Sequence, residues 1–504
     1  MQSRSYEGVK DSGAGAEFEV LHKDLLGRIG KLRTEHGYVE TPLIMPVINP
    51  NLKTIEAAEM HEYGAEMLIT NAYIIYKKAE LREEALKHGV HSLLGTELPV
   101  MTDSGAYQLS QYSDVEVSNS EILRFQRYIG SDICVPLDIP TPPYVSRERA
   151  MRDLEETHKR LKEAREIIND RMLTGVVQGS TYLDLRETSA KRAAAIGFDI
   201  YAIGGVVPLL ESYQFDRLVD IIMAVKRNLP LNAPIHLFGA GHPMLFALAV
   251  ALGCDIFDSA AYAIYAKTGR YITCEGTKKV QDLQFLPCSC PICSTYTLDE
   301  VKSSADLLAE HNLWVTFEEM RTVKQSIVEG SLWELCERRC RAHPALFAAL
   351  KRITRYSALI ERYDPVTKHP FFYLSECSAH RPEVLRYSKR LNRFRLSGNV
   401  LVLLTASSYL RPEYESRFDH LLLVKPPFGP YPIELGESYP VGQAEIPAEV
   451  DEESEKVALE NVLRLLKMHK GDASFVLRCA RRWARHPLME EIGKYAEVEF
   501  EDED

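Results

Sequence analysis

The stretch RMLTGVVQGSTYLDLRETSAKRAAAIGFDIYAIGG (171–205) contains the unit from which the fold can be inferred. An apolar run at 173–178 is followed by a segment of helical length, and then by a second apolar run at 200–204. Both runs are short and apolar and end in glycine or polar residues, which is typical of buried strands. The segment therefore predicts a strand, a helix and a second strand that lies parallel to the first.

The same alternation recurs along the first 260 residues of this 504-residue chain. Eight short apolar runs are separated by amphipathic or charged segments, of which 147–171 and 211–228 are the clearest predicted helices. The predicted strands are 43–47, 67–71, 99–103, 133–138, 173–178, 200–204, 235–239 and 256–258. Eight such units match a (β/α)₈ TIM barrel in number, order and size, and a doubly wound open sheet is the alternative.

Composition limits the class of protein. The chain is 45% hydrophobic and 26% charged, which is typical of a soluble globular protein with a large core. It contains no apolar run near the ~20 residues that a membrane span needs, and residues 1–15 have no apolar signal-peptide core. A cytoplasmic location is therefore expected. The net charge of −12 gives no overall attraction to nucleic acid, so any such binding must use local basic patches or a partner.

The chain is too long for one ordinary domain, and its composition changes after about residue 345. We expect the barrel within residues 1–345, together with an inserted subdomain (about 283–320) that contains a cluster of cysteines. A basic accessory domain is predicted at 346–440, and a smaller C-terminal α/β domain with an acidic tail at 441–504. The C-terminal part is thus expected to consist of small α+β domains.

A metal site is predicted from one cysteine cluster. Cys288, Cys290 and Cys293 form the pattern C-x-C-x-x-C, and His311 follows eighteen positions after the last of them. Three thiolates and one imidazole suit a closed tetrahedral Zn²⁺ site, although His343 is an alternative fourth ligand. Four protein ligands leave no position for water, so we expect one structural zinc per subunit. A barrel metalloenzyme that uses zinc to make hydroxide is the alternative.

Polar residues end five of the eight predicted strands, at the end of a barrel where active sites lie. They are Asn71, Asp103, Asp138, Gln178 and Asp258. Asp103 and Asp258 suggest paired-carboxylate chemistry at an anomeric carbon, in which one carboxylate attacks and the other moves a proton. Asp138 and Gln178 can donate and accept hydrogen bonds in one plane, and Tyr107 could stack on a flat ring. Ordinary loop and helix-cap roles are the alternative.

Several stretches carry a resemblance to a known family. TDSGAYQLS (102–110), VPLDIPTPP (135–143), VVQGS (176–180), AIGGVV (202–207) and FDSAAYAIYAKTGRY (257–271) occur in order ahead of the cysteine cluster. Together they resemble the tRNA-guanine transglycosylases, and PLDIPTPP and FDSAAYA resemble the archaeal branch. Members of that branch exchange guanine 15 of the tRNA D-loop for 7-cyano-7-deazaguanine, on the route to archaeosine. The resemblance covers roughly residues 18–345 and implies a pentosyltransferase.

The resemblance also implies residue roles. Asp258 would be the nucleophile on the ribose, and Asp103 would be the general acid and base for the leaving guanine. The remaining implied roles are base binding by Asp138, Gln178, Tyr107 and the backbone of Gly205 and Val206, RNA contacts by Lys267 and Arg270, and zinc binding by Cys288, Cys290, Cys293 and His311. Asp255 is a rival nucleophile, but it lies three residues before Asp258 and should face the other way on a regular strand.

The implied partners are tRNA, guanine and 7-cyano-7-deazaguanine, and the family suggests a homodimer. Archaeal members often end in an RNA-binding PUA domain, which is not evident in this sequence, so a separate PUA-domain protein is a candidate partner. The alternative function is that of a diverged paralogue that binds tRNA without exchange or acts later in archaeosine synthesis. Both aspartates and all four candidate metal ligands are present, which favours exchange.

Overall fold

The structure, a computed structural model, describes residues 18–52, 54–106, 117–404 and 412–501. The chain forms two compact units. The first contains residues 27–328 and 339–349 together with the described residues before 24. The second contains residues 24–26 and 329–338 and the described residues from 350 onward. Among the described helices, none is both long and apolar enough to cross a membrane.

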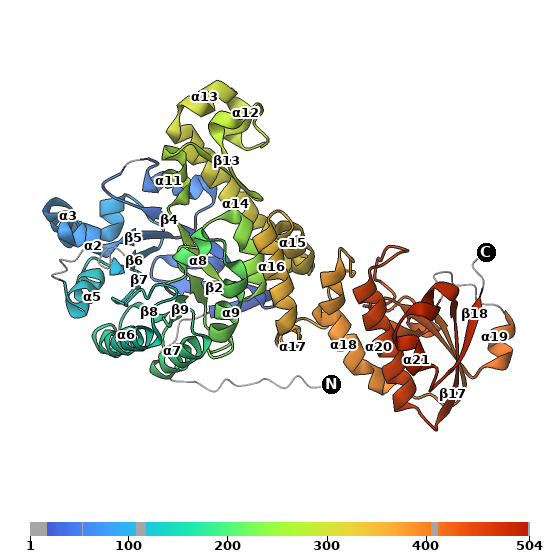
Figure 1. Cartoon of the computed structure of the whole chain (residues 1–504). Coiled ribbons are helices and arrows are strands. Elements are labelled where there is room, and N and C mark those ends of the chain that lie inside the picture. The colour runs from blue at the N-terminus through green and yellow to red at the C-terminus, as the bar shows by residue number, and fades with distance from the viewer. Residues whose placement is uncertain (1–17, 53, 107–116, 405–411, 502–504) are drawn as a thin grey trace, which may run out of the picture. The chain divides into compact units, whose positions relative to one another are not determined.

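Eight parallel strands close into a barrel in the first unit (Figure 1). Their order around the barrel is β10-β11-β4-β5-β6-β7-β8-β9. The strands are β4 (Leu43–Ile48), β5 (Leu68–Asn71), β6 (Val100–Asp103), β7 (Ile133–Cys134), β8 (Met172–Val177), β9 (Ile200–Ile203), β10 (Ile235–Leu237) and β11 (Ile256–Ser259). The predicted TIM barrel is therefore confirmed, and the open doubly wound sheet is excluded.

One strand is much shorter than predicted. β7 ends at Cys134, whereas the apolar pattern extended it to residue 138. The reason is that two side chains of the preceding helix, rather than a neighbouring strand, accept hydrogen bonds from the backbone after Cys134. The backbone N–H of Val135 donates to Gln126, and the N–H of Leu137 donates to Asn119. The backbone after β7 therefore leaves the sheet with its hydrogen bonds satisfied, and Asp138 follows on this irregular segment.

Helices surround the barrel on its outer side (Figure 1). Some of them begin at a capping side chain, as at Ser118, which forms a capping box with Glu121, and at Ser146, which accepts a bond from the N–H of Arg149. The helices of this part are α1 (Met60–Tyr63), α2 (Ala72–Lys77), α3 (Ala79–Leu94), α5 (Asn119–Tyr128), α6 (Arg147–Ile167), α7 (Leu183–Ile196), α8 (Val207–Glu211), α9 (Phe215–Lys226), α10 (Phe246–Ala251) and α11 (Ala261–Lys267).

The barrel interior is closed at its amino-terminal end by a hairpin. The hairpin strands are β2 (Gly27–Thr34) and β3 (Gly37–Thr41), and β1 (Phe18–Asp24) completes a three-stranded sheet. Leu32 and Val39 of the hairpin pack in one cluster with residues of the barrel strands. Burial of this apolar cluster stabilises the barrel and leaves the opposite end, where the strands terminate, available for a site.

A small subdomain follows β11 in the sequence. It contains an antiparallel pair, β12 (Arg270–Thr273) with β13 (Gly276–Lys279), and the short helices α12 (Pro291–Thr295) and α13 (Leu298–Ser303). The long helix α14 (Ala305–Glu329) comes next, followed by α15 (Leu332–Cys340) and α16 (Pro344–Ile353).

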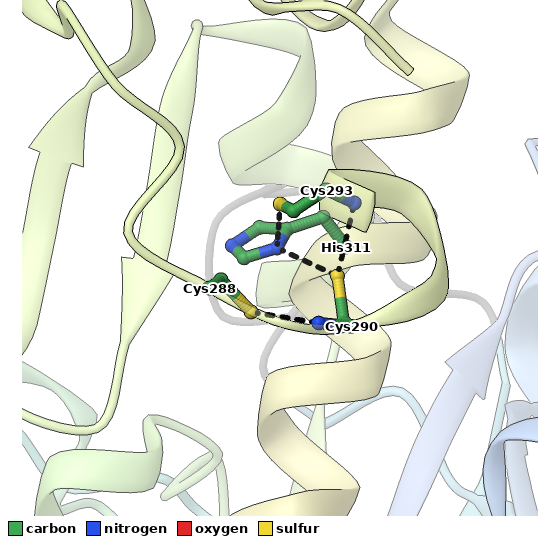
Figure 2. A group of neighbouring side chains, drawn as sticks. All are labelled: Cys288, Cys290, Cys293 and His311. Atoms are coloured by element: carbon green, nitrogen blue, oxygen red, sulfur yellow. Dashed lines mark hydrogen bonds between the residues drawn. The ribbon is translucent and has the colours of Figure 1, made fainter. Parts of the chain in front are cut away.

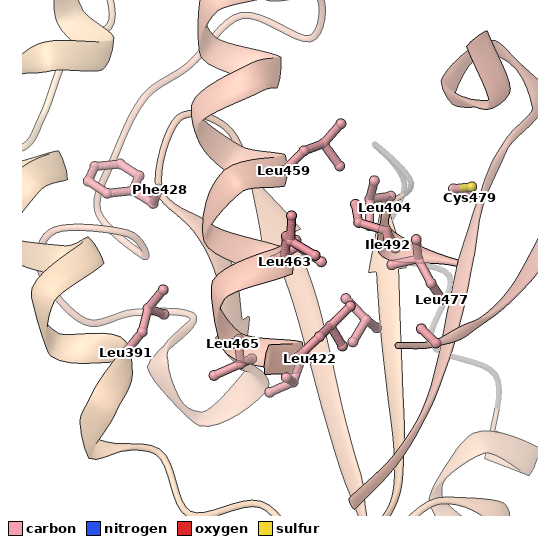
Figure 3. Packing of buried hydrophobic residues seen from close by; sticks show 14 of the residues in the cluster. Leu391, Leu404, Leu422, Phe428, Leu459, Leu463, Leu465, Leu477, Cys479 and Ile492 are labelled. Atoms are coloured by element: carbon pink, nitrogen blue, oxygen red, sulfur yellow. The ribbon is translucent and has the colours of Figure 1, made fainter. Parts of the chain in front are cut away.

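The second unit contains a five-stranded sheet in the order β16-β15-β14-β17-β18. Its strands are β14 (Gly398–Leu404), β15 (His420–Lys425), β16 (Gly429–Pro432), β17 (Ala473–Ala480) and β18 (Glu497–Glu501), and its helices are α17 (Ser357–Ile360), α18 (Pro382–Arg390), α19 (Pro412–Arg417), α20 (Glu452–Met468) and α21 (Leu488–Ile492). Figure 3 shows Leu459 and Leu463 of α20 facing Leu404 and Leu477 of the sheet. The sheet contains strands from both predicted accessory regions, 346–440 and 441–504. The boundaries proposed for the three domains stay a prediction.

Candidate active site

The carboxyl ends of the barrel strands bring the predicted polar residues together. Asp103 is the last residue of β6, Asp258 lies in β11, and Asp138 and Gln178 follow β7 and β8. The side chain of Asn71, at the end of β5, donates to Asp103 Oδ2 over 3.2 Å. All five therefore lie at one end of the barrel, as parallel strands require.

The surroundings of Asp103 bring the pKa of its carboxyl group close to neutral pH. Its Oδ2 accepts hydrogen bonds from Asn71 Nδ2 and from the N–H of Gly105, each over 3.2 Å. Burial, together with the negative charges of Asp138 and Asp258, raises the pKa of Asp103 to about 7. A carboxyl group with this pKa can both donate and accept a proton at neutral pH.

A hydrogen bond joins the side chains of Asp138 and Gln178. Gln178 is fully buried, and its Nε2 donates to Asp138 Oδ2 over 2.6 Å. Burial raises the pKa of Asp138 to about 6, although the bond from Gln178 lowers it. Gly205 adopts a φ of +69°, and a Cβ atom there would lie 2.8 Å from Gln178 Oε1. Only glycine therefore allows the backbone to lie against this pair, beside the buried Val206.

One oxygen of Asp258 is fixed and the other is open. Oδ1 accepts a bond from His236 Nε2 over 2.9 Å and one from the N–H of Gly239 over 2.8 Å. No residue that the structure describes donates to Oδ2. His236 was missed by the sequence analysis, because one histidine inside an apolar strand gives no signal of its partner. The arrangement leaves one oriented, anionic oxygen for attack.

Asp255 has a structural role instead. It is buried and forms a two-pronged ion pair with Arg28, whose Nε and Nη2 lie 2.8 and 2.9 Å from its oxygens. It also accepts a bond from the N–H of Ile235. With both oxygens engaged, Asp255 is not free to act as a nucleophile.

A second residue missed from the sequence is Arg186. This fully buried side chain on α7 donates to the carbonyl oxygens of Val177, Ser180 and Gly204. Burial lowers its pKa to about 9, while the charge of Asp138 opposes that change. Arg186 thus ties the ends of β8 and β9 together. It also contributes positive charge that favours the ionised form of Asp138.

Of the remaining predicted residues, two follow Asp258 closely in the sequence and one lies outside the described residues. Tyr107 is among the residues that the structure does not describe. Lys267 ends α11, and Arg270 begins β12, so both follow Asp258 closely along the chain. Both side chains are exposed, and the guanidinium of Arg270 lies 5.0 Å from the ring centre of Tyr265. This cationic pair is available to an anionic ligand.

The four predicted metal ligands come together beside α14 (Figure 2). Their ligand atoms all lie within 4.8 Å of one another, and His311 Nδ1 lies 3.4 Å from the sulfur atoms of Cys290 and of Cys293. Ligand pairs of a tetrahedral zinc–cysteine–histidine site are separated by about 3.5 Å, so this donor set fits a zinc ion. His343 is not part of the cluster and instead stacks on Tyr213 at 4.8 Å.

The surroundings of His311 prepare it as a ligand. Its Nε2 lies 3.0 Å from the carbonyl oxygen of Ile272, which requires a proton on Nε2 and leaves the lone pair of Nδ1 facing the cysteines. The ring of Tyr271 stacks on the imidazole at 3.7 Å, and its hydroxyl lies 3.2 Å from Cys293 Sγ. The imidazole is therefore fixed in the tautomer and orientation that metal binding needs.

A second cluster of metal-ligating residue types contains His36, His91 and Asp132. The two rings are stacked at 3.7 Å with 25° between their planes, and each nitrogen lies 2.8 or 3.0 Å from a different oxygen of Asp132. Nearly parallel rings cannot both direct a lone pair to one ion about 2 Å away. The carboxylate therefore bridges two ring N–H groups, and the cluster ties the hairpin to the barrel.

The predicted basic accessory region is partly neutralised by its own acidic residues. Arg386 is buried and pairs with Glu361 and Asp364, and Lys389 also pairs with Glu361. These two cations are engaged within the second unit. The side chains of Arg393 and Arg395 are exposed.

Comparison with known proteins identifies the family. The model of the family described as queuine tRNA-ribosyltransferase matches residues 24–345. The chain belongs to this family. It is 54% identical to the tRNA-guanine(15) transglycosylase of Methanosarcina acetivorans over 96% of this chain and 98% of that protein. It is 48% identical to the enzyme of the same name from Archaeoglobus fulgidus, over 93% and 96% of the two chains. The family match spans the whole barrel and the cysteine cluster.

Proposed function

We propose that this chain is a tRNA-guanine(15) transglycosylase, which replaces guanine 15 of tRNA by 7-cyano-7-deazaguanine through a covalent intermediate on Asp258. Family membership and the names of its relatives support a tRNA-guanine transglycosylase, which is a pentosyltransferase. The observation that carries the mechanism is the pairing of an anchored carboxylate, Asp258, with a carboxyl of pKa about 7, Asp103.

The first step releases guanine. Asp258 Oδ2 attacks C1′ of the ribose, the bond from C1′ to the base breaks, and its electron pair goes to the base. The leaving guanine takes a proton from the carboxyl of Asp103, because an unprotonated purine is a poor leaving group. The sugar passes through an oxocarbenium-like state that the anionic Asp258 stabilises. The product is an ester between Asp258 and the RNA, together with neutral guanine.

The second step reverses the first with a different base. The incoming 7-deazaguanine loses its ring N–H proton to the Asp103 carboxylate, and its nitrogen attacks C1′. The ester bond breaks, and Asp258 regains its carboxylate. Two inversions at C1′ give net retention. Asp103 returns to its protonated form, so one residue near its pKa serves as acid and then as base.

The base is recognised by Asp138 and Gln178, with the backbone of Gly205 and Val206 closing the pocket and Tyr107 stacking on the ring. Because Gln178 occupies Oδ2 of Asp138, Oδ1 is left to accept N–H groups of a guanine-type base. A base without these donors would leave Oδ1 of the half-buried Asp138 without a partner, which disfavours its binding. The target nucleotide leaves its stack at a cost of a few kcal/mol, which contacts from Lys267 and Arg270 to RNA phosphates help to offset.

Zinc has a structural role in this proposal. Cys288, Cys290, Cys293 and His311 hold one ion per subunit. The bound ion would supply folding free energy by crosslinking residues 288–293, which include part of α12, to α14. We further propose a homodimer, a cytoplasmic location beside the tRNA pool, and a separate PUA-domain protein as an RNA-binding partner.

An exchange assay tests the proposed function. Purified protein is incubated with tRNA and labelled guanine, and a chase of 7-cyano-7-deazaguanine follows. We expect label to enter position 15 and then to be displaced by the chase. An Asp258→Asn variant should bind tRNA without incorporating label. If the unaltered protein binds tRNA but exchanges no base, the non-exchanging paralogue is the correct function.

A further inference from the structure

His236 lies on β10, beside the strand that carries Asp258. Its side chain is fully buried, and its Nε2 lies 2.9 Å from Asp258 Oδ1. Its other nitrogen, Nδ1, is buried and has no hydrogen-bond partner among the described residues. The ring of Phe238 lies 4.3 Å from the imidazole. The histidine therefore has one polar contact in the described structure, and that contact is with the residue proposed as nucleophile.

The orphan Nδ1 indicates the protonation state of the ring. A doubly protonated imidazole would bury an N–H with no acceptor, which is costly for a charged group. A neutral imidazole with its proton on Nε2 leaves only a lone pair without a partner. The same tautomer gives Asp258 Oδ1 the donor that a carboxylate oxygen requires.

We propose that His236 is a positioning residue, which donates from a neutral imidazole to Asp258 and so fixes Oδ1 while leaving Oδ2 free to attack the ribose. This inference rests on the proposed function and adds a residue to its machinery. Together with the N–H of Gly239, His236 prevents the carboxylate from rotating. A neutral donor does this without supplying the full positive charge that would weaken the nucleophile.

The same contact serves both halves of the reaction. When Oδ2 forms the ester, Oδ1 becomes the ester carbonyl oxygen, and both N–H donors still point at it. When the ester breaks, negative charge returns to the carboxylate, and the two donors stabilise it as it develops. Loss of the His236 donor should therefore slow formation and breakdown of the adduct, with no direct effect on tRNA binding.

Two amide substitutions separate this role from simple packing. In His236→Gln, the amide nitrogen lies as many bonds from Cβ as Nε2 of the imidazole, so it can reach Asp258. In His236→Asn, the amide nitrogen corresponds to Nδ1. It lies one bond closer to Cβ than Nε2 does, so it cannot reach Asp258. Both variants are neutral and polar, and both leave a similar apolar gap. His236→Phe fills the space of the ring without a donor.

The experiment measures the single-turnover rate of protein–RNA adduct formation on a denaturing gel, together with tRNA affinity and melting temperature. We expect His236→Phe and His236→Asn to slow adduct formation about 10- to 100-fold, as loss of a hydrogen bond to a charged group predicts. His236→Gln should stay within a few-fold of the unaltered protein, and tRNA affinity should stay unchanged in all three. His469→Phe, which alters a buried histidine of the second unit, is the matched control and should leave the rate unchanged.

Three results would overturn the inference. They are an unchanged rate in folded His236→Phe, equal rates in the Gln and Asn variants, and a loss that appears in tRNA affinity alone. If His236→Phe does not fold, the comparison of Gln with Asn still decides. Absence of any adduct in the unaltered protein would instead contradict the proposed function, so the two failures are distinguishable.

Discussion

Asp103→Asn should make the protein more stable while removing its activity. The ordinary pKa of an aspartate is 3.8, and in the folded protein that of Asp103 is raised to about 7 by burial and by the charges of Asp138 and Asp258. The folded state therefore binds a proton that the unfolded state has already lost between these two values. An asparagine keeps the acceptor for Asn71 and Gly105 but carries no charge.

The magnitude follows from the two pKa values. Ionising a carboxyl whose pKa is raised from 3.8 to about 7 costs about 4 kcal/mol of folding free energy at most. Because the side chain is only partly buried, solvent screens part of this cost, and about 2 kcal/mol is the expected gain. The cost is absent below pH 4, grows between pH 4 and pH 7, and is complete above pH 7. The gain from Asp103→Asn should follow the same course.

Thermal unfolding followed by circular dichroism at pH 8 and at pH 4.5 measures this difference. At pH 8 the variant should melt about 3–5 °C higher than the unaltered protein, and at pH 4.5 no more than about half of this gain should remain. Asp282→Asn, which neutralises an exposed carboxylate of the same unit, is the control and should melt within about 1 °C of the unaltered protein at both pH values. A variant that is no more stable at pH 8, or equally stabilised at both pH values, would refute the raised pKa.

The other predictions concern rate, metal and RNA. Release of guanine needs protonated Asp103, so its single-turnover rate should fall as the pH rises through about 7. In Asp138→Asn, which removes a neighbouring negative charge, the midpoint should move lower by about one pH unit, and a fixed midpoint would exclude the coupling. Cys290→Ser should lose zinc, measured by mass spectrometry of metals, and should melt at a lower temperature. A folded, zinc-free and inactive variant would contradict a purely structural ion. Lys267→Glu combined with Arg270→Glu should weaken tRNA binding and flatten its salt dependence, and unchanged binding would remove both from the RNA surface.

The barrel was predictable because its signals are local. Each strand is a short apolar run, and side chains alternate along it, so Asp258 and Asp255 were expected on opposite faces. In the structure, Asp255 pairs with Arg28 and Asp258 contacts His236. The length of β7 was not predictable, because it depends on side chains of a helix that replace the ladder. No local pattern reports such a contact.

The contacts made by His236 and Arg186 depend on tertiary structure in the same way. His236 lies in an apolar strand. Arg186 lies in a helix, where a charged residue usually faces solvent. Only the folded chain brings Arg186 to three carbonyl oxygens and His236 to a carboxylate. The metal cluster was predictable from cysteine spacing. Spacing alone left His343 open as the fourth ligand, whereas the resemblance pointed to His311, which the structure brings to the cysteines.

The most direct test of the account is to identify the atom that holds the RNA during exchange. Protein is mixed with tRNA, denatured during turnover, digested with nuclease and protease, and sequenced by mass spectrometry. We expect one ribonucleotide remnant, attached to the peptide at Asp258 and absent from Asp258→Asn. A remnant on Asp103 or another residue, or the absence of any attachment in a protein that exchanges guanine, would contradict it.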